Sequence, residues 1–222
     1  MIGLRIEQIL LHPPLKISDP AWMMHSDSKL PVLEFFAGGG LARLGLDTRF
    51  ACVFANDIDP LKSRVYQDNF GDTHYVEGDI WKLRADDLPD ANLAWASFPC
   101  QDLSLAGARK GLNAPRSGAF WGFWRLIEAL DKQDRAPQTL ALENVCGLIS
   151  SRGGRDLEAL VETIANTGYR VGALVLDAAW FTPQSRPRLF IIAHKGKIPA
   201  GMEGAPDPAF HPNNLQNAVA RM

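Results

Sequence analysis

Short apolar runs alternate with segments of helical periodicity along most of the chain. Apolar runs of strand length are found at residues 32–36, 50–55, 93–97, 140–142, 171–176 and 189–193. Segments with apolar residues three or four positions apart, which indicate helices, are residues 41–46, the stretch that Pro60 opens, 119–130, 156–166 and 215–222. Alternation of this kind predicts an α/β fold with a mostly parallel sheet and helices on both faces. The last two runs are expected to form a hairpin.

The same pattern divides the chain into three parts. Residues 1–30 carry several prolines and no clear periodicity, which predicts an N-terminal extension. The alternation fills residues 31–195, a length sufficient for one domain with its own core. Residues 196–222 are richer in Gly and Pro at their start, so they are predicted as a C-terminal connector.

Composition narrows the class of protein. The chain has 222 residues, 46% hydrophobic and 22% charged, with a formal net charge of -2, which is typical of a soluble globular domain. This balance excludes binding to nucleic acid through bulk charge, so such contact would need a local basic patch. The apolar run at residues 9–11 is too short for a membrane span and lacks the features of a signal peptide, so a cytoplasmic protein without a membrane partner is predicted.

A glycine-rich turn follows the first predicted strand, at residues 36–40. A strand, a glycine turn and a helix place backbone N–H groups where an anionic group can dock. The turn lacks the third glycine of a dinucleotide fingerprint, so a pyrophosphate is disfavoured, whereas a carboxylate could use the same donors.

Two acidic residues follow the next predicted strands. Asp57 lies about 20 residues beyond the glycines, where an acid can accept hydrogen bonds from ribose hydroxyls. Asp79 follows a third probable strand, and its simpler interpretation is a turn-capping role. Because the carboxyl ends of parallel strands share one edge of the sheet, these features together predict a site for an adenosine-bearing ligand without phosphates.

The chemistry-bearing candidates lie further along the chain. Cys100, in the segment 98–101, follows a strand and enters a polar loop, whereas Cys52 lies within an apolar run and is predicted to be structural. Cys146 is ambiguous. None of the three cysteines has a CxxC partner or a histidine at ligand spacing, so we expect no disulfide and no metal site. A nucleophilic cysteine requires its thiolate form to be favoured or generated during attack.

Polar groups at two later strands suit such a nucleophile. Glu143 lies at the end of an apolar run, where an acid is unusual unless it has a partner; the simpler alternative is a capping or surface residue. Arg186 and Arg188 are two residues apart and would share one face of an extended chain. Arginine is suited to holding carbonyl or phosphate oxygens.

These motifs, taken in order, resemble the conserved blocks of DNA cytosine-C5 methyltransferases. The resemblance covers roughly residues 31–193, and the blocks are residues 36–40, 56–59, 78–80, 98–101, 143–145 and 184–188. It implies a Rossmann-like fold, S-adenosylmethionine as cofactor and double-stranded DNA as substrate, as in restriction-modification enzymes of bacteria or phages. The residues that it implies for cofactor binding are Phe36, Gly38, Gly40, Asp57, Ile58, Asp79, Ile80 and Pro99. Within this set, Asp57 would bind the ribose, Ile58 would pack on the adenine and Asp79 would meet the adenine amino group.

The resemblance also implies a covalent mechanism. Cys100 would attack C6 of a cytosine rotated out of the duplex. Glu143 would hold N3 and the exocyclic amine, Arg188 would hold O2, and Arg186 would support the loop. Carbon C5 would then take the methyl group, and loss of its proton would release Cys100.

Two departures from the family pattern bear on function. Glu34 stands where the family usually has Asp, and Leu41 replaces a frequent glycine. Only about 29 residues follow Ala193, where the family continues into a target-recognition domain and two further blocks. The alternatives are one subunit of a split enzyme whose partner recognises the target, a truncated product, or a remnant that binds the cofactor without catalysis.

Two other functions would use some of the same residues. A transfer-RNA cytosine methyltransferase shares the blocks, but the Cys-Phe-Thr segment of that branch is absent from this sequence. A small-molecule methyltransferase would explain the glycine turn and Asp57, but not Cys100, Glu143 and the arginine pair together.

Overall fold

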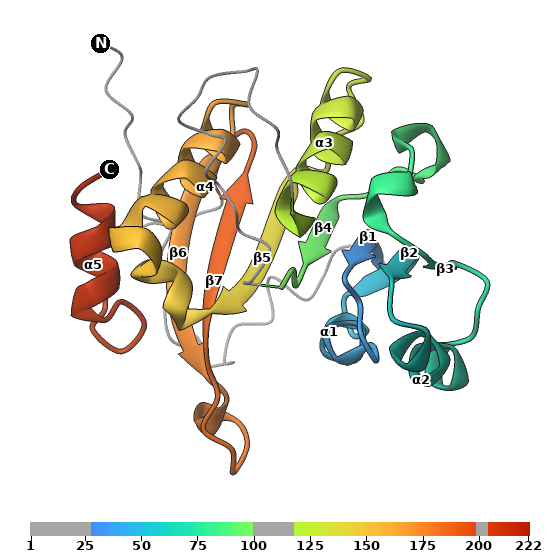
Figure 1. Ribbon diagram of the computed structural model, residues 1–222, viewed down its shortest axis with the longest axis horizontal. Coiled ribbons are helices and arrows are strands. Elements are labelled where there is room, and N and C mark those ends of the chain that lie inside the picture. The colour runs from blue at the N-terminus through green and yellow to red at the C-terminus, as the bar shows by residue number, and fades with distance from the viewer. Residues whose placement is uncertain (1–27, 100–117, 199–203) are drawn as a thin grey trace.

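The computed structural model describes residues 28–99, 118–198 and 204–222, which form one seven-stranded sheet with flanking helices (Figure 1). The strands are β1 (Leu30–Phe35), β2 (Phe50–Asp57), β3 (Tyr75–Glu77), β4 (Leu93–Ala96), β5 (Thr139–Val145), β6 (Arg170–Asp177) and β7 (Pro187–His194). Their order is β3-β2-β1-β4-β5-β7-β6, and the first five are parallel. β7 is antiparallel to both of its neighbours, β5 and β6.

The helices cover both faces of the sheet, as predicted. They are α1 (Leu41–Leu46), α2 (Pro60–Phe70), α3 (Ala119–Asp131), α4 (Arg155–Ala165) and α5 (Asn213–Val219). Side chains of α3, α4 and α5 share the largest apolar cluster with one face of the sheet. Side chains of α2 and the end of α1 join smaller clusters on the other face.

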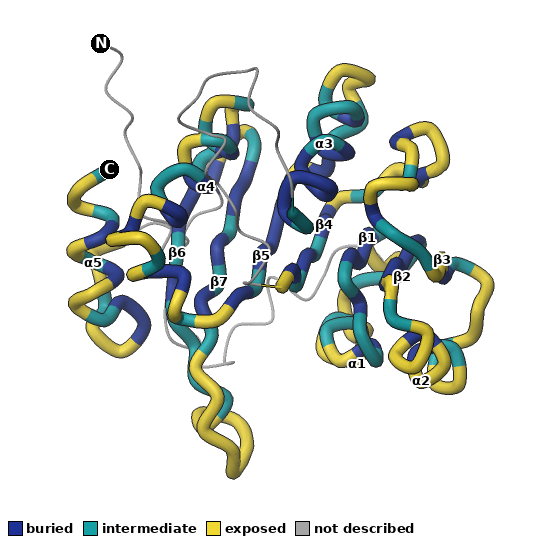
Figure 2. Tube along the Cα trace, viewed as in Figure 1, coloured by how far each residue is buried: buried dark blue, intermediate teal, exposed yellow. Residues whose placement is uncertain are grey.

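Burial on both faces of β1 explains why its sequence forms an interior strand. Leu33 and Phe35 are fully buried toward α3, where the Phe35 ring meets that of Phe123 edge-on at 5.2 Å. Val32 is buried on the opposite face. Successive residues of a strand point to opposite faces, so burial of residues 32–35 shows that both faces of β1 are covered, as expected for a strand between β2 and β4 (Figure 2).

Two details differ from the predicted elements. β5 continues two residues beyond Glu143, so this acid lies inside a strand instead of ending it. The predicted hairpin is confirmed, since β6 pairs with β7 from Arg170↔His194 to Asp177↔Pro187. Its second strand lies beside β5, so that the earlier strand β6 forms the sheet edge.

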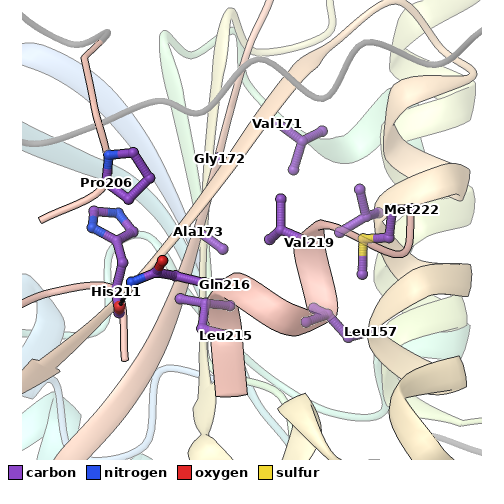
Figure 3. Close-up of a pocket in the computed structure, with 11 residues that line it drawn as sticks. Leu157, Val171, Gly172, Ala173, Pro206, His211, Leu215, Gln216, Val219 and Met222 are labelled. Atoms are coloured by element: carbon purple, nitrogen blue, oxygen red, sulfur yellow. Dashed lines mark hydrogen bonds between the residues drawn. The ribbon is translucent and has the colours of Figure 1, made fainter. Parts of the chain in front are cut away.

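The C-terminal residues pack on the domain. Leu215 and Ala218 of α5 are buried in the main apolar cluster, and Val175 in β6 donates its amide to the Phe210 carbonyl (2.8 Å). A narrow cavity of about 20 Å³ remains between α4, β6 and α5, beside the buried imidazole of His211 (Figure 3). A space of this size holds about one water molecule. The domain boundary at residue 195 stays a prediction.

Among the described residues, no helix is both long enough and apolar enough to cross a bilayer.

Candidate active site

A cavity of about 790 Å³ opens at the carboxyl ends of β1, β2 and β4. The predicted site residues that line it are Phe36, Gly38, Asp57, Ile58, Asp79, Ile80, Pro99, Glu143 and Arg186. Gly40 packs behind its wall, and Arg188 adjoins it through an ion pair with Glu143. Cys100 lies outside the described residues. The topology thus brings most of the predicted residues to one edge of the sheet.

The carboxylate of Asp57 organises the glycine turn. One oxygen accepts a hydrogen bond from the Gly38 amide at 2.8 Å, and the other accepts from the Asp59 amide at 2.9 Å. The side chain is 7% exposed and therefore largely shielded from water. Asp57 consequently uses part of its acceptor capacity within the protein, and each oxygen retains a lone pair for a ligand hydroxyl.

Gly40 is required by packing as well as by backbone conformation. Its φ of 86° lies in the left-handed region that favours glycine. A Cβ atom at this position would lie 2.3 Å from the Phe70 ring and 3.1 Å from the Tyr66 ring, both on α2. The glycine therefore allows α2 to pack closely behind the turn that borders the cavity.

Asn56 fixes the neighbouring wall. Its side-chain nitrogen donates to the carbonyls of Val76 (2.8 Å) and Gly78 (2.9 Å), which joins the end of β2 to the segment after β3. Asp79 begins the next turn and accepts a hydrogen bond from the Trp81 amide at 3.0 Å. The turn-capping interpretation of Asp79 is thus confirmed, although its carboxylate also lines the cavity.

The charges around the cavity indicate which ligands it suits. Four acids, Glu34, Asp57, Asp79 and Glu143, and two bases, Lys62 and Arg186, line it. Glu143 is paired with Arg188 and burial raises the pKa of Glu34 to about 7, so Asp57 and Asp79 are the acids whose charge disfavours a pyrophosphate beside them. Ile58, which is 64% exposed, and Ile80 supply apolar surface for a flat ring. The lining therefore fits S-adenosylmethionine, a cationic ligand with an adenosine group and no phosphates.

An ion pair adjoins the cavity where Glu143 lines it. Arg188 Nε is 2.9 Å from Glu143 Oε1, and both side chains are about one fifth exposed. The next residue, Asn144, is buried, donates to the Phe98 carbonyl at 3.0 Å and accepts from the Val145 amide. Because Phe98 stands two residues before Cys100, Asn144 ties the start of the predicted nucleophile loop to the strand that carries Glu143.

Glu34 is buried in a polar cluster beneath the glycine turn. It is 1% exposed and accepts hydrogen bonds from the Arg43 amide (3.3 Å) and the Tyr66 hydroxyl (3.4 Å). The Arg43 guanidinium in turn donates to the Tyr66 hydroxyl and contacts the His74 ring. Burial raises the pKa of Glu34 from 4.5 to about 7, and the two hydrogen bonds and the positive charge of Arg43 only partly oppose it.

Replacing Glu34 by Gln is expected to change how stability depends on pH. A raised folded-state pKa stabilises the protein fully below about pH 4.5, and this contribution is lost as pH rises through about 7. The shift corresponds to about 3 kcal/mol of unfolding free energy. Urea unfolding at pH 5 and pH 8 should therefore show a steeper loss in the parent protein than in E34Q. His74 titrates in both proteins, so equal losses would contradict this account.

The cysteines and acids in the described ranges indicate neither a reactive thiol nor a metal site. Cys52 and Cys146 are free thiols, and burial raises the pKa of both. Cys52 contacts the Tyr66 hydroxyl and joins the apolar clusters, in line with a structural role. Across the described ranges, no three His, Cys, Asp or Glu side chains come together as a metal site would require.

Several residues that shape the site were not predicted from the sequence. Asn56 and Asn144 stand inside the conserved blocks beside Asp57 and Glu143, and this position was the available signal. Glu34 was noted as a departure from the family pattern, but its burial depends on residues distant in sequence. No local pattern indicates such long-range contacts.

Known proteins resemble both the sequence and the fold. The sequence model for the family described as "C-5 cytosine-specific DNA methylase" matches residues 30–221. The chain is 31% identical over 193 residues to the type II methyltransferase M.BsuFI of Bacillus subtilis, covering 86% of this chain and 44% of that protein. It is 36% identical over 169 residues to M.MspI of a Moraxella species, covering 75% and 39%.

A solved structure agrees with these matches. The Dnmt2 methyltransferase of S. pombe superposes with a TM-score of 0.62 at 27% identity, over 80% of this chain and 53% of that protein. This chain spans about half the length of the curated relatives that it matches. On the family match and the sequence identities, the chain belongs to the C-5 cytosine-specific DNA methylase family.

Proposed function

We propose that this chain is the catalytic half of a DNA cytosine-C5 methyltransferase. The observation that carries the proposal is the Glu143–Arg188 ion pair beside a cavity suited to S-adenosylmethionine. In this cavity Asp57 would accept from the ribose hydroxyls, Ile58 would pack on the adenine, and Asp79 would accept from the adenine amino group. Phe36, Gly38, Ile80 and Pro99 would form the remaining wall, and Gly40 would support it.

The proposed reaction uses the ion pair to receive the base. A cytosine rotated out of the duplex would replace the contact between the two side chains, so that Glu143 binds N3 and the exocyclic amine while Arg188 binds O2. In this exchange the Glu143 carboxylate gains the amine of the base and the Arg188 guanidinium gains its carbonyl oxygen, so neither charged side chain is left without a polar partner. Arg186, which is exposed just before β7, would support the loop that carries Cys100.

Bond formation follows from this placement. The Cys100 thiolate adds to C6, and the electron pair of the C5–C6 double bond moves toward C5. A proton that Glu143 delivers to N3 neutralises the negative charge that the addition places on the ring, and it returns when the thiolate leaves. S-adenosylmethionine, when bound, supplies an electrophilic methyl group to C5. A base then removes the C5 proton, the double bond re-forms, and Cys100 leaves as thiolate.

A second subunit that carries target recognition is the partner we propose. The chain spans about half the length of its relatives, and large apolar side chains near the cavity face solvent. They are Leu41 and Leu44 on α1, Ile58 beside it, and Leu61 and Val65 on α2, with exposures of 51–83%. Clustered apolar surface of this kind is typical of a protein interface.

Transfer of tritiated methyl groups tests the proposal. The chain would be assayed on duplex DNA and on transfer RNA, alone and with a neighbouring gene product that matches the other half of the relatives. We expect label in DNA as 5-methylcytosine when both halves are present. Label in transfer RNA alone would favour the RNA-directed alternative. Cofactor binding without transfer to either nucleic acid would contradict a catalytic role and favour the remnant.

A further inference from the structure

One arginine of α3 makes an unusual set of contacts with the wall of the cavity. Arg125 Nη2 lies within hydrogen-bond distance of three backbone carbonyls, those of Ile80 (2.9 Å), Trp81 (2.8 Å) and Leu83 (2.7 Å). The guanidinium also lies over the Trp81 ring, 5.5 Å from its centroid. These acceptors belong to the turn formed by residues 79–83, whose 3-10 helix spans Ile80–Lys82. A cation at the carbonyl end of a helical turn satisfies groups that the turn itself cannot pair.

A glycine brings α3 close enough for these contacts. Gly122 lies one helical turn before Arg125, and thus on the same side of α3. A Cβ atom on Gly122 would lie 2.6 Å from Ile80 Cγ2 and 3.2 Å from Trp81 Nε1. Glycine inside a helix costs about 1 kcal/mol relative to alanine, so close packing against the turn gives it a physical reason.

The same turn presents the groups that face the ligand. Asp79, Ile80 and Trp81 all line the cavity. Within the described ranges, the hydrogen bonds of Asp79 itself stay inside the turn, from the Trp81 amide to its carboxylate and from the Lys82 amide to its carbonyl, while Asn56 anchors the preceding Gly78. The position of its carboxylate relative to the rest of the cavity therefore depends on how firmly α3 holds the turn.

We propose that Arg125, together with Gly122, is a positioning residue that sets the selectivity of the cavity for adenine. The inference rests on the proposed function, because it assigns the 79–83 turn to the adenine of S-adenosylmethionine. A carboxylate attracts the amino group of adenine and repels the carbonyl oxygen that hypoxanthine carries at the same position. A fixed Asp79 carboxylate increases the difference in affinity between the two bases, and a mobile turn decreases it.

Two ligands and three variants separate selectivity from stability. S-adenosylhomocysteine and S-inosylhomocysteine differ in the group at that position of the base and in the proton on the neighbouring N1, so the ratio of their dissociation constants reports on recognition of this edge of adenine. The ratio is measured by calorimetry for the parent chain, R125M, R125K and R135M. Arg135 is the matched control, because it pairs with Asp90 (2.6 Å) and donates to the Leu88 carbonyl. In the described part of the chain, residues 85–90 contribute nothing to the cavity wall.

We expect R125M to weaken S-adenosylhomocysteine binding roughly tenfold to a hundredfold, as for loss of one charge-assisted hydrogen bond, with little change for the inosine ligand. R125K should recover part of the ratio, because an ammonium can still donate to one carbonyl. R135M should lower the melting temperature and leave the ratio unchanged.

The outcomes distinguish this inference from the function on which it rests. A parent chain that binds neither ligand would contradict the proposed function itself. A parent chain that prefers adenine, with the same preference in R125M, would overturn the role of Arg125. If R125M does not fold, R125K decides: a ratio reduced at least threefold supports the inference, and an unchanged ratio overturns it.

Discussion

Replacing Glu143 by Gln is expected to lower kcat for cytosine methylation by roughly a hundredfold to a thousandfold, as for loss of one preorganised group that stabilises developing charge. The amide keeps the size of the side chain but cannot deliver a proton to N3 as a carboxylic acid can. It also removes the partner of Arg188, which lies 2.9 Å from the carboxylate. Affinity for S-adenosylmethionine should stay unchanged, because we assign Glu143 to the base and not to the cofactor.

The assay compares single-turnover rates of the two proteins with the recognition half present, and calorimetry gives cofactor affinity. Glu77→Gln serves as a matched control, since Glu77 is an exposed acid at the end of β3 and lines no part of the cavity within the described residues. An E143Q rate within threefold of the parent rate would show that this carboxylate does not act on the base. A drop in cofactor affinity alone would assign Glu143 to the methyl-donor side.

The strand pattern was predictable because burial on both faces imposes apolar runs. Leu33, Phe35 and Val32 illustrate this, since all three are buried although they point to opposite sides of β1. The order of the last strands was not predictable in the same way. The hairpin indicated that β6 and β7 pair, but no local signal shows that the later strand lies next to β5.

The edge of the sheet that carries the site could also be predicted. Asp57 ends β2, Asp79 follows β3 and Glu143 lies near the end of β5, and the parallel topology of these strands brings all three to one edge of the sheet. The internal bonds of these groups were not foreseeable. Asp57 was expected to face a ribose, and the structure shows that it also holds the Gly38 amide. A strand-end acid can do both, and its sequence position is the same in either case.

The α3 helix shows what apolar periodicity can predict from the sequence and what it cannot. Its apolar spacing predicted a helix that packs on the core, and Phe120, Phe123 and Trp124 are buried there. Arg125 was not a candidate, because a single arginine on an amphipathic helix ordinarily faces solvent. Its bonds to three carbonyls depend on a turn more than 40 residues earlier in the chain.

Replacing Cys100 by Ser is expected to abolish methyl transfer, by a factor of at least about 10⁴, as when a nucleophile that acts together with its partners is removed. A hydroxyl has a far higher pKa than a thiol and is a weaker nucleophile toward C6. Cofactor binding should remain, since Asp57, Asp79 and Ile58 are unchanged. A C100S protein that still methylates cytosine would exclude the covalent mechanism.

A covalent bond between Cys100 and cytosine C6 is detected most directly with duplex DNA that contains 5-fluorocytosine. A base can remove a proton from C5 but cannot remove fluorine in the same way, so the methylated intermediate stays bound to the enzyme. Cys146→Ser is the matched control, because burial raises the pKa of that thiol and we assign it no bond to substrate. With S-adenosylmethionine and the recognition half present, the account predicts a denaturation-resistant adduct that maps to Cys100, persists in C146S and is absent from C100S. Failure of the parent chain to form that adduct, although it binds both cofactor and DNA, would contradict the account.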